Sequence, residues 1–354
     1  MKKILTFLAL SIFGLCQQTN ALVILQYHHI SDSTPPSTSL SPELFQQHLA
    51  HLKENNFKVI RLESAIESLK NGTAIEDKSV VITFDDGYRS VYTTAFPLLK
   101  KYNFPFTVFV NTAPIEQKLP QFMNWKELQK LIDNGGSVAN HSVNHLHLIR
   151  QNQGAQSSSL ETIIRKEITD AQSLLEEKLS YVLKAFAYPY GEYSMQTKKV
   201  VKSLGFVAFG QQSGAASDKT DLQAIPRFPF GGKYGDLDDF ILKVNSLPMP
   251  VERVFLLDGD NKELKEHLLK LNIDKPKLKL VLAEQKEKLQ IGCYASGGEK
   301  LSSTATLDGY IFTPNLSLPV GRSRYNCTAP SGQIGRFYWF SQPWIMPSEE
   351  GLYF

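Results

Sequence analysis

Residues 80–84 read VVITF, and the carboxylate pair Asp85-Asp86 follows at once. A continuous apolar and β-branched run of this length predicts a strand that is buried on both faces, as in a parallel sheet. Two adjacent carboxylates at the end of such a strand are electrostatically costly unless a positive group, such as a divalent metal, lies beside them. The stretch therefore predicts a parallel sheet with a charged site at one edge. A plainer interpretation is that Asp86 caps the helix that follows.

Short apolar strands alternate with helical patterns on both sides of this run. The expected strands are residues 22–25, 59–60, 106–110, 137–139, 185–187 and 207–209. The expected helices are residues 42–52 with Ser41 as N-cap, 62–69, 92–99, 125–132, 160–179 and 200–204. This alternation predicts an α/β fold, a parallel β/α barrel that is complete or incomplete. The polar residues of interest follow strand ends, where parallel α/β folds place their active sites.

The pattern changes near residue 250, where Pro248 interrupts it. Beyond it, short alternating strands are expected at residues 277–283, 289–294, 309–313 and 336–340. They predict a small all-β domain of sandwich type over residues 249–354, after an α/β domain over residues 22–248. Cys293 and Cys327 both fall inside the β domain. An even pair of cysteines in an exported chain predicts a disulfide, with two reduced core cysteines as the alternative.

The N-terminal segment reads as a signal peptide. Lys2 gives a positive start, residues 4–15 form an apolar run too short to span a bilayer comfortably, and Ala21 fits a signal-peptidase site. We expect cleavage after Ala21, which removes residues 1–21. The mature chain is then expected to be periplasmic or extracellular, without a transmembrane segment. A lipid anchor at Cys16 is the alternative, although the residue before it is not small.

The composition is that of an ordinary globular protein. Hydrophobic residues make up 42% of the chain and charged residues 21%, and the formal net charge is +3, from 38 basic and 35 acidic residues. So small a basic excess gives no reason to expect nucleic acid as a partner. We expect a monomer.

His141 and His145 are four residues apart and follow the strand expected at residues 137–139. On one helical turn, or in a tight loop, this spacing brings two imidazoles to one point. Two neutral nitrogen ligands and one carboxylate would make a metal site with open positions for water and substrate, which is typical of a catalytic site. A surface helix that carries histidines by chance is the alternative interpretation.

Two motifs resemble those of the NodB-homology polysaccharide deacetylases, carbohydrate esterase family 4. Residues 83–88, TFDDGY, are similar to the first motif of the family. Residues 141–145, HSVNH, match its second motif, His-Ser/Thr-x-x-His, about 55 residues later. The resemblance covers residues 22 to 235 and implies a barrel of NodB-homology type.

The resemblance also implies roles for the motif residues. Asp85 would be the catalytic base, and the metal ligands would be Asp86, His141 and His145. The metal would be zinc, with cobalt, nickel or iron fitting the same ligands. The implied activity is a hydrolase of linear amides, which removes acetyl groups from an N-acetylated polysaccharide of the N-acetylglucosamine type and releases acetate.

Two further features of the family are altered. Residues 187–191, AYPYG, resemble the family's Arg-x-Pro-Tyr segment, but Ala187 stands where the arginine that orients the catalytic aspartate would be. Arg227 is the candidate replacement from another strand end, and the backbone N–H of Tyr190 would help to form an oxyanion hole. The late Leu-x-His that supplies the general acid is missing. His28, preceded by a tyrosine, resembles the Tyr-His opening of a subgroup that includes the periplasmic poly-N-acetylglucosamine deacetylases, which implies that His28 is the general acid.

Three other functions stay open. An esterase that removes O-acetyl groups from another polysaccharide would use the same centre. A catalytically weak member of the family that only binds glycan would be consistent with the missing arginine. A phosphoacceptor site of receiver type also uses acidic pairs at strand ends, but the export signal and the histidine pair argue against it.

Overall fold

The computed structural model describes residues 21–150, 157–283 and 289–353. The predicted signal peptide, residues 1–21, lies outside the described residues apart from Ala21. None of the helices in the described part of the chain is both long enough and apolar enough to cross a membrane.

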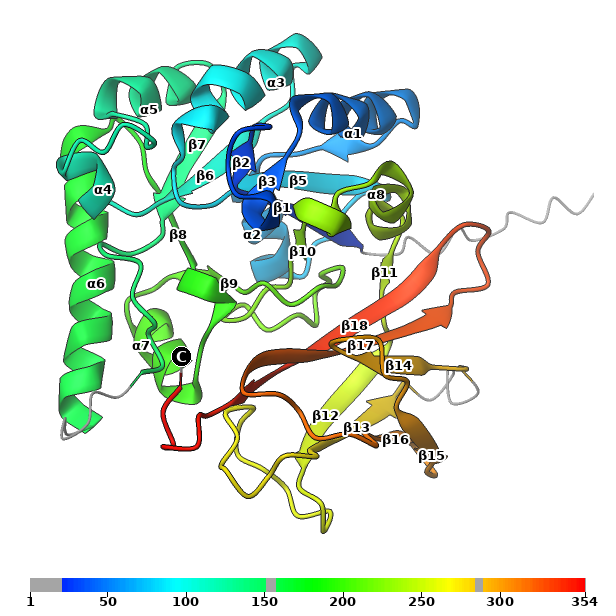
Figure 1. Cartoon of the computed structure of the whole chain (residues 1–354). Coiled ribbons are helices and arrows are strands. Elements are labelled where there is room, and N and C mark those ends of the chain that lie inside the picture. Colours follow the sequence, from blue (N-terminus) through cyan, green and yellow to red (C-terminus); the bar gives the residue numbers. More distant parts are fainter. Residues whose placement is uncertain (1–20, 151–156, 284–288, 354) are drawn as a thin grey trace, which may run out of the picture.

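A parallel sheet forms the centre of the larger part of the molecule (Figure 1). Its strands are β1 Leu22–Tyr27, β4 Lys58–Val59, β5 Ser79–Phe84, β6 Phe106–Val110, β7 Gly136–Asn140, β8 Leu183–Ala187, β9 Val207–Phe209 and β10 Phe228–Pro229. They lie in the order β10-β1-β5-β6-β7-β8-β9, and β4 pairs in addition with β5. Among the described residues no pairing of β9 with β10 closes the sheet. The fold is therefore an incomplete parallel β/α barrel, which confirms the predicted fold class.

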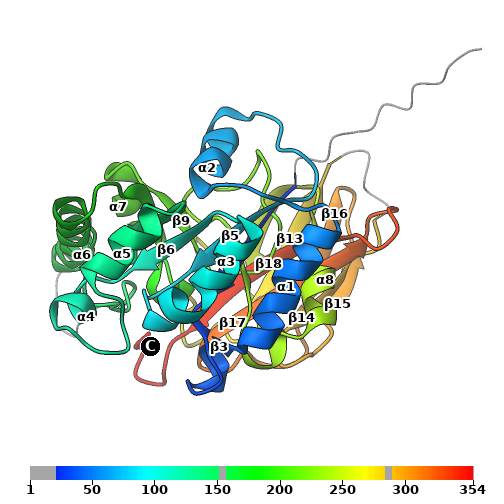
Figure 2. The ribbon, with the colours of Figure 1, turned by 90° about the horizontal axis from the view of Figure 1, so that it is seen from above.

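Most of the helices pack on one face of this sheet, whereas α2 lies on the other (Figure 2). They are α1 Pro42–Glu54, α2 Leu62–Asn71, α3 Phe96–Tyr102, α4 Ala113–Glu116, α5 Trp125–Ile132, α6 Ser157–Lys178, α7 Met195–Ser203 and α8 Leu237–Val244. Alternate residues of β1 enter two separate cores. Val23 and Leu25 pack in a core with residues of α1, α3 and α5, whereas Leu22 and Ile24 pack with residues of α2. Because both faces of β1 are buried, every residue of the strand must be compatible with an apolar environment. This explains the continuous apolar sequence from which the strand was predicted.

Local signals set the helix starts. The Ser41 side chain accepts a hydrogen bond from the N–H of Leu44, which confirms it as the N-cap of α1. A π-helical segment, Val91–Ala95, leads directly into α3 and was not predicted from the periodicity. Shorter elements are β2 His29–Ile30, β3 Ser39–Leu40, and the 3-10 turns η1 Pro36–Thr38, η3 Pro189–Gly191 and η4 Gly232–Tyr234.

Two four-stranded sheets follow the barrel. Their strands are β11 Leu247–Pro248, β12 Val251–Leu257, β13 Lys277–Leu282, β14 Gly292–Ala295, β15 Ser302–Ala305, β16 Gly309–Thr313, β17 Gly321–Pro330 and β18 Phe337–Met346. One sheet has the order β11-β18-β17-β14 and the other β12-β13-β16-β15. Both contribute to one core, for example through Leu280, Phe312 and Trp344, so the sheets form a sandwich. The four predicted strands are confirmed as β13, β14, β16 and β18, whereas β11, β12, β15 and β17 were not predicted.

A disulfide joins Cys293 of β14 to Cys327 of β17, at facing positions of neighbouring strands. The short strand β11 leads from α8 into the same sheet, where it pairs with β18. We propose that the two domains divide here, near residue 248.

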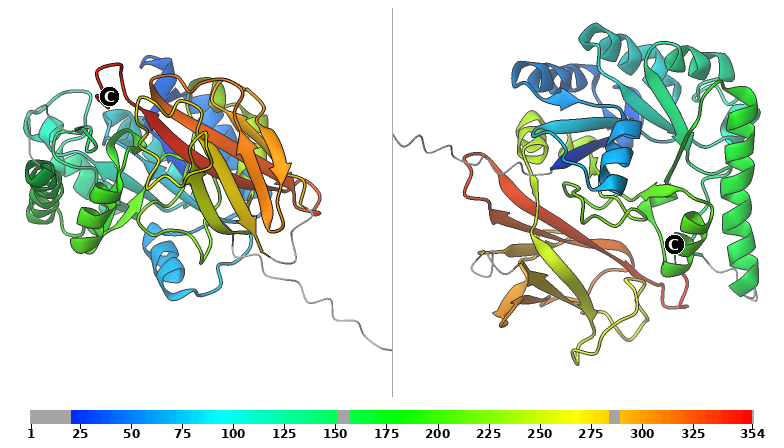
Figure 3. Two further views of the ribbon diagram at one scale, coloured as in Figure 1. Left: turned by 90° about the horizontal axis from the view of Figure 1, so that it is seen from below. Right: turned by 180° about the vertical axis from the view of Figure 1, so that it is seen from behind.

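The C-terminal part of the chain, which includes the sandwich, packs against the barrel (Figure 3). The Trp339 ring of β18 lies edge-on to the Phe228 ring of β10, with 5.2 Å between their centroids. Near the C-terminus, the Tyr353 carbonyl accepts a hydrogen bond from Nε of Arg150 at 3.1 Å. The β sheets thus share a contact surface with the barrel.

Candidate active site

Asp85 lies at the carboxyl end of β5 and is fully buried. Its two oxygens face the Arg227 guanidinium, with Oδ1 2.7 Å from Nη1 and Oδ2 2.8 Å from Nη2. Gln26 of β1 also donates from Nε2 to Oδ2, at 2.6 Å. Burial raises the pKa of Asp85, but the charge of Arg227 is the largest of the effects that lower it, and the net pKa lies below the usual range. Asp85 is therefore a fixed carboxylate at neutral pH.

Arg227 directly precedes β10, and its guanidinium group makes several contacts besides those with Asp85. Nε donates to the Gly210 carbonyl at 2.9 Å, and Nη1 lies 3.3 Å from the Thr83 hydroxyl. The guanidinium carbon lies 5.3 Å from the centroid of the Phe109 ring. A fully buried charge is tolerated when it is paired and hydrogen-bonded in this way. Arg227, the candidate replacement for the arginine that is missing at position 187, thus contacts Asp85, the candidate base.

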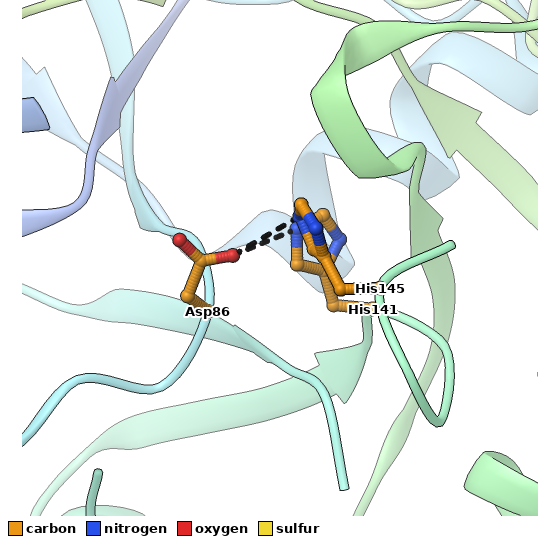
Figure 4. A group of neighbouring side chains, drawn as sticks. All are labelled: Asp86, His141 and His145. Carbon is orange, nitrogen blue, oxygen red and sulfur yellow. Dashed lines mark ion pairs between the residues drawn. The ribbon is translucent and has the colours of Figure 1, made fainter. Parts of the chain in front are cut away.

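Asp86, His141 and His145 each bring one ligand atom to a common point (Figure 4). Oδ1 of Asp86 lies 3.2 Å from Nε2 of His141 and 3.3 Å from Nε2 of His145, and the three atoms all lie within 4.8 Å of one another. Nδ1 of His141 donates to the Ala187 carbonyl at 2.8 Å. In the neutral ring this leaves Nε2 with a lone pair that faces Asp86.

The donor set of this group fits a divalent metal. Oδ1 of Asp86 and Nε2 of His141 are buried and have no hydrogen-bond partner in the described part of the chain. Two buried acceptors that face each other are unfavourable unless a cation lies between them. One carboxylate and two imidazoles are ligands that zinc and its neighbours accept, and a metal-binding histidine commonly donates its other N–H to a carbonyl. Burial lowers the pKa of His145 to about 4, so this ring is neutral at neutral pH.

The loop after β7 fixes the two histidines. The Asn140 side chain accepts from the N–H of Ser142 at 2.8 Å, and the Ser142 hydroxyl accepts from the N–H of His145 at 3.0 Å. The buried carboxylate of Glu167, on α6, accepts from two further backbone N–H groups of the loop at 3.1 and 2.8 Å. The histidines therefore lie on a tight loop, not on the surface helix of the alternative interpretation.

Several residues of this edge have the left-handed backbone conformation that non-glycine residues avoid. The angle φ is 72° at Asp86, 72° at Ser142, 55° at His145 and 58° at Tyr190. Such conformations cost on the order of 1–3 kcal/mol each and persist where the surroundings fix them. They occur after β5, β7 and β8, at the carboxyl edge of the sheet.

Tyr190 lies in the turn η3, directly after β8. The centroid of its ring is 4.5 Å from that of His145, and the ring stacks on His147 at 3.8 Å. At Gly191 a Cβ atom would lie 2.6 Å from the Gln211 side chain, so the turn has no room for a larger residue there. This packing holds the backbone of Tyr190 beside the candidate metal ligands, while His147 lies outside the ligand group.

His28 lies between β1 and β2 and is partly buried. His28 follows β1, which pairs with β5 in the sheet, so it lies at the same carboxyl edge as Asp85 and Asp86. His29 instead stacks on Tyr88, with 3.6 Å between the ring centroids. The structure therefore brings His28 to the same edge as the other candidate residues.

Comparison with known proteins relates one segment of the chain to a known family. Residues 73–209 match the family model described as polysaccharide deacetylase. This segment is a polysaccharide deacetylase domain. The poly-beta-1,6-N-acetyl-D-glucosamine N-deacetylase of Staphylococcus epidermidis is 26% identical to the chain over 229 residues, which are 59% of this chain and 79% of that protein.

Solved structures agree with the deacetylase fold. The Streptococcus pyogenes deacetylase PplD, in complex with acetate, superposes with a TM-score of 0.57 and 25% identity over 64% of this chain and 99% of that chain. IcaB from Ammonifex degensii superposes with a TM-score of 0.54 and 25% identity over 62% of this chain and 95% of that chain.

The family match does not span the whole candidate site. It contains Asp85, Asp86, His141, His145 and Tyr190. The other two candidate residues, His28 and Arg227, lie outside the matched segment. They follow β1 and precede β10, and β10, β1 and β5 are neighbours in the sheet.

Three supporting residues were missed from the sequence. Gln26 is a polar residue inside an apolar strand, and this anomaly is a signal that would have found it. Asn140 and Glu167 carry no such signal, because their roles depend on how α6 packs against the loop after β7.

Proposed function

We propose that this chain is an exported, metal-dependent deacetylase that removes N-acetyl groups from a polysaccharide of the poly-β-1,6-N-acetylglucosamine type. The proposal rests on the buried ion pair between Asp85 and Arg227. Asp85 is adjacent in sequence to Asp86, which forms the candidate metal site together with His141 and His145. The Staphylococcus epidermidis relative is a poly-beta-1,6-N-acetyl-D-glucosamine N-deacetylase, which supports the choice of polymer.

The metal would be held by Asp86, His141 and His145, with zinc as the first candidate and cobalt, nickel or iron as alternatives. When bound, the ion would act as a Lewis acid that polarises the acetamide carbonyl and lowers the pKa of water.

Asp85 would act as the general base. Oδ2 accepts from both Arg227 and Gln26, whereas Oδ1 accepts from Arg227. Oδ1 is therefore the oxygen that has a lone pair for the attacking water. Because Arg227 fixes both oxygens, the carboxylate does not need to reorganise when it takes the proton.

Tyr190 and His28 would complete the reaction. The water oxygen bonds to the acetyl carbon, and the backbone N–H of Tyr190 would donate to the oxyanion that forms. The C–N bond then breaks, and His28 would protonate the departing amine. The products are acetate and a free amino sugar.

Arg227 also bears on the catalytically weak alternative. That interpretation is consistent with the missing arginine at position 187, and a guanidinium that reaches Asp85 from β10 supplies the contact by another route. We therefore favour turnover over binding alone.

Export is part of the proposal. The sequence of residues 1–21 supports it, and the Cys293–Cys327 disulfide is in keeping with an oxidising compartment such as the periplasm or the cell exterior.

The test is acetate release by the metal-loaded protein. The substrates are poly-β-1,6-N-acetylglucosamine, chitin oligomers and acetylated xylan, and free amines are measured beside acetate. We expect equal amounts of acetate and new amine from the N-acetylglucosamine polymers. Acetate from xylan alone would instead favour the O-acetyl esterase, and no acetate from any of them would contradict the enzyme function.

A further inference from the structure

The turn that carries Tyr190 is contacted from the β sandwich. Arg322 lies on β17, and its Nη1 donates to the Tyr190 carbonyl at 2.7 Å although the two residues are 132 positions apart in the chain. The guanidinium carbon of Arg322 also lies 5.5 Å from the centroid of the Tyr190 ring. One side chain of the second domain thus touches both the backbone and the ring of a candidate active-site residue.

A buried carboxyl group strengthens this link. Glu192, two residues after Tyr190, has a side chain that is only 1% exposed, and its Oε1 lies 3.5 Å from Nε of Arg322. That Oε1 atom has no hydrogen-bond partner in the described part of the chain. Burial raises the pKa of Glu192 to about 7, against the opposing charges of Arg322 and Arg150. Arg322 is thus one of two cations that stabilise the ionised form of Glu192.

The Glu192 carboxyl group also contacts His147, whose ring stacks on the ring of Tyr190. Oε2 of Glu192 lies 2.7 Å from Nδ1 of His147. The His147 ring stacks on Tyr190 with 4° between the ring planes, and the Tyr190 ring in turn lies edge-on to His145. Arg322, Glu192, His147 and Tyr190 therefore form one contact cluster that ends at a candidate metal ligand.

The conformation of Tyr190 explains why such a cluster would matter. Its φ of 58° is disfavoured for a residue with a side chain, so local preference would turn the residue away from this geometry. Arg322 restrains ψ of Tyr190 through the carbonyl and the direction of the side chain through the ring, and these contacts stabilise the conformation of the turn that presents the Tyr190 N–H. Within the turn, the N–H of Gly191 bonds to the Tyr188 carbonyl at 2.8 Å, which leaves the Tyr190 carbonyl for Arg322.

We propose that Arg322 is a positioning residue of the deacetylase centre, and that the sheet β11-β18-β17-β14 thereby completes the active site instead of being a dispensable appendage. The proposal rests on the proposed function, because it assumes that the N–H of Tyr190 stabilises the oxyanion. Arg322 acts through Tyr190 and does not itself touch the reacting atoms.

The test compares Arg322→Ala with a matched control, Arg61→Ala, in the full metal-loaded chain. Arg61 resembles Arg322 in exposure, with side chains that are 45% and 51% exposed, and it also donates to a backbone carbonyl and pairs with a glutamate, at the start of α2. We expect kcat of Arg322→Ala to fall about ten-fold to a hundred-fold with KM within about two-fold, since a displaced oxyanion donor acts in the transition state. Metal content should stay at the wild-type level, and Arg61→Ala should keep wild-type kcat.

Two further arms keep the test decisive. If Arg322→Ala does not fold, Arg322→Lys takes its place, because one ammonium group cannot serve both the Tyr190 carbonyl and Glu192, and a partial loss of kcat is expected. Amide hydrogen exchange of the peptide that spans residues 188–193 should be faster in the Arg322 variant than in wild type, and unchanged in Arg61→Ala.

The outcomes separate the two proposals. Wild-type kcat in the folded Arg322 variant, or unchanged exchange at residues 188–193, would overturn the positioning role. An inactive wild-type protein would contradict the proposed function itself, and the exchange measurement would then still decide whether Arg322 holds the turn.

Discussion

Replacing Arg227 by methionine would remove the guanidinium that faces Asp85 and keep a side chain of similar reach. Both side chains of the pair are 0% exposed, so the change would leave a buried carboxylate with Gln26 as its remaining side-chain donor. Removing one partner of a buried ion pair costs about 3–5 kcal/mol of stability. A catalytic group displaced by about 1 Å can lose about a hundred-fold in rate, and we expect a fall of that size in kcat.

The assay combines urea unfolding at pH 7 with acetate release from the N-acetylglucosamine polymer. The matched control is Arg165→Met, because Nη2 of Arg165 also lies close to a carboxylate, 3.0 Å from Oε1 of Glu161, but these two side chains are 41% and 50% exposed. We expect the control to lose only about 0–1 kcal/mol and to keep its activity.

A double-mutant cycle with Asp85→Asn gives the sharpest result. The single variants each leave one buried group without its partner, so the double variant should be less destabilised than their sum, by a few kcal/mol at most. Additive losses of stability, or a kcat of Arg227→Met within about two-fold of wild type, would refute the argument from the buried pair.

Two other predictions concern stability. His48 is fully buried, and burial lowers its pKa to about 3, while burial likewise lowers the pKa of His267 to about 4. These folded-state pKa values lie below the unfolded value of about 6.5, so the unfolded chain binds protons more readily as the pH falls. The two histidines therefore do not change the stability above about pH 6.5, and below it the unfolding free energy decreases, by on the order of 2 kcal/mol per histidine at pH 5. Urea titrations at pH 7 and pH 5 should show this loss, and His48→Gln should remove about half of it; an equal loss in the variant would contradict the assignment. Reducing the Cys293–Cys327 disulfide, which links positions 34 residues apart, should lower the unfolding free energy by about 3–4 kcal/mol as an upper estimate, whereas unchanged stability would show that the crosslink is unimportant.

Much of the fold followed from local pattern. The run at residues 80–84 predicted a strand buried on both faces, and β5 has apolar cores on either side. The strand at residues 106–110 and the helix at 125–132 agree with the structure at both ends. In these segments burial alone decides the structure, so the periodicity of apolar residues is sufficient.

The strands β12, β15 and β17 were missed for a physical reason. Each is largely or alternately exposed, and the four residues of β15 are all exposed. Such strands are held by backbone pairing with the strands beside them, and their own sequence carries little apolar signal.

The site divides in the same way. Asp85, Asp86 and the two histidines were visible because each group lies within a short motif after one strand. The contacts of Arg227 with Asp85 and of Arg322 with Tyr190 span 142 and 132 residues, and only the folded topology brings these groups together. Arg227 was found because a motif arginine was missing, whereas nothing in the sequence marked Arg322.

The central claim is that Asp85 is the base of a metal site formed by Asp86 and the two histidines. The most direct test measures bound metal and acetate release for Asp85→Asn after loading with zinc, beside Asp86→Ala. The account predicts that Asp85→Asn keeps the wild-type metal content and loses acetate release by about a hundred-fold or more, while Asp86→Ala loses both. Acetate release at the wild-type rate by metal-loaded Asp85→Asn would contradict it.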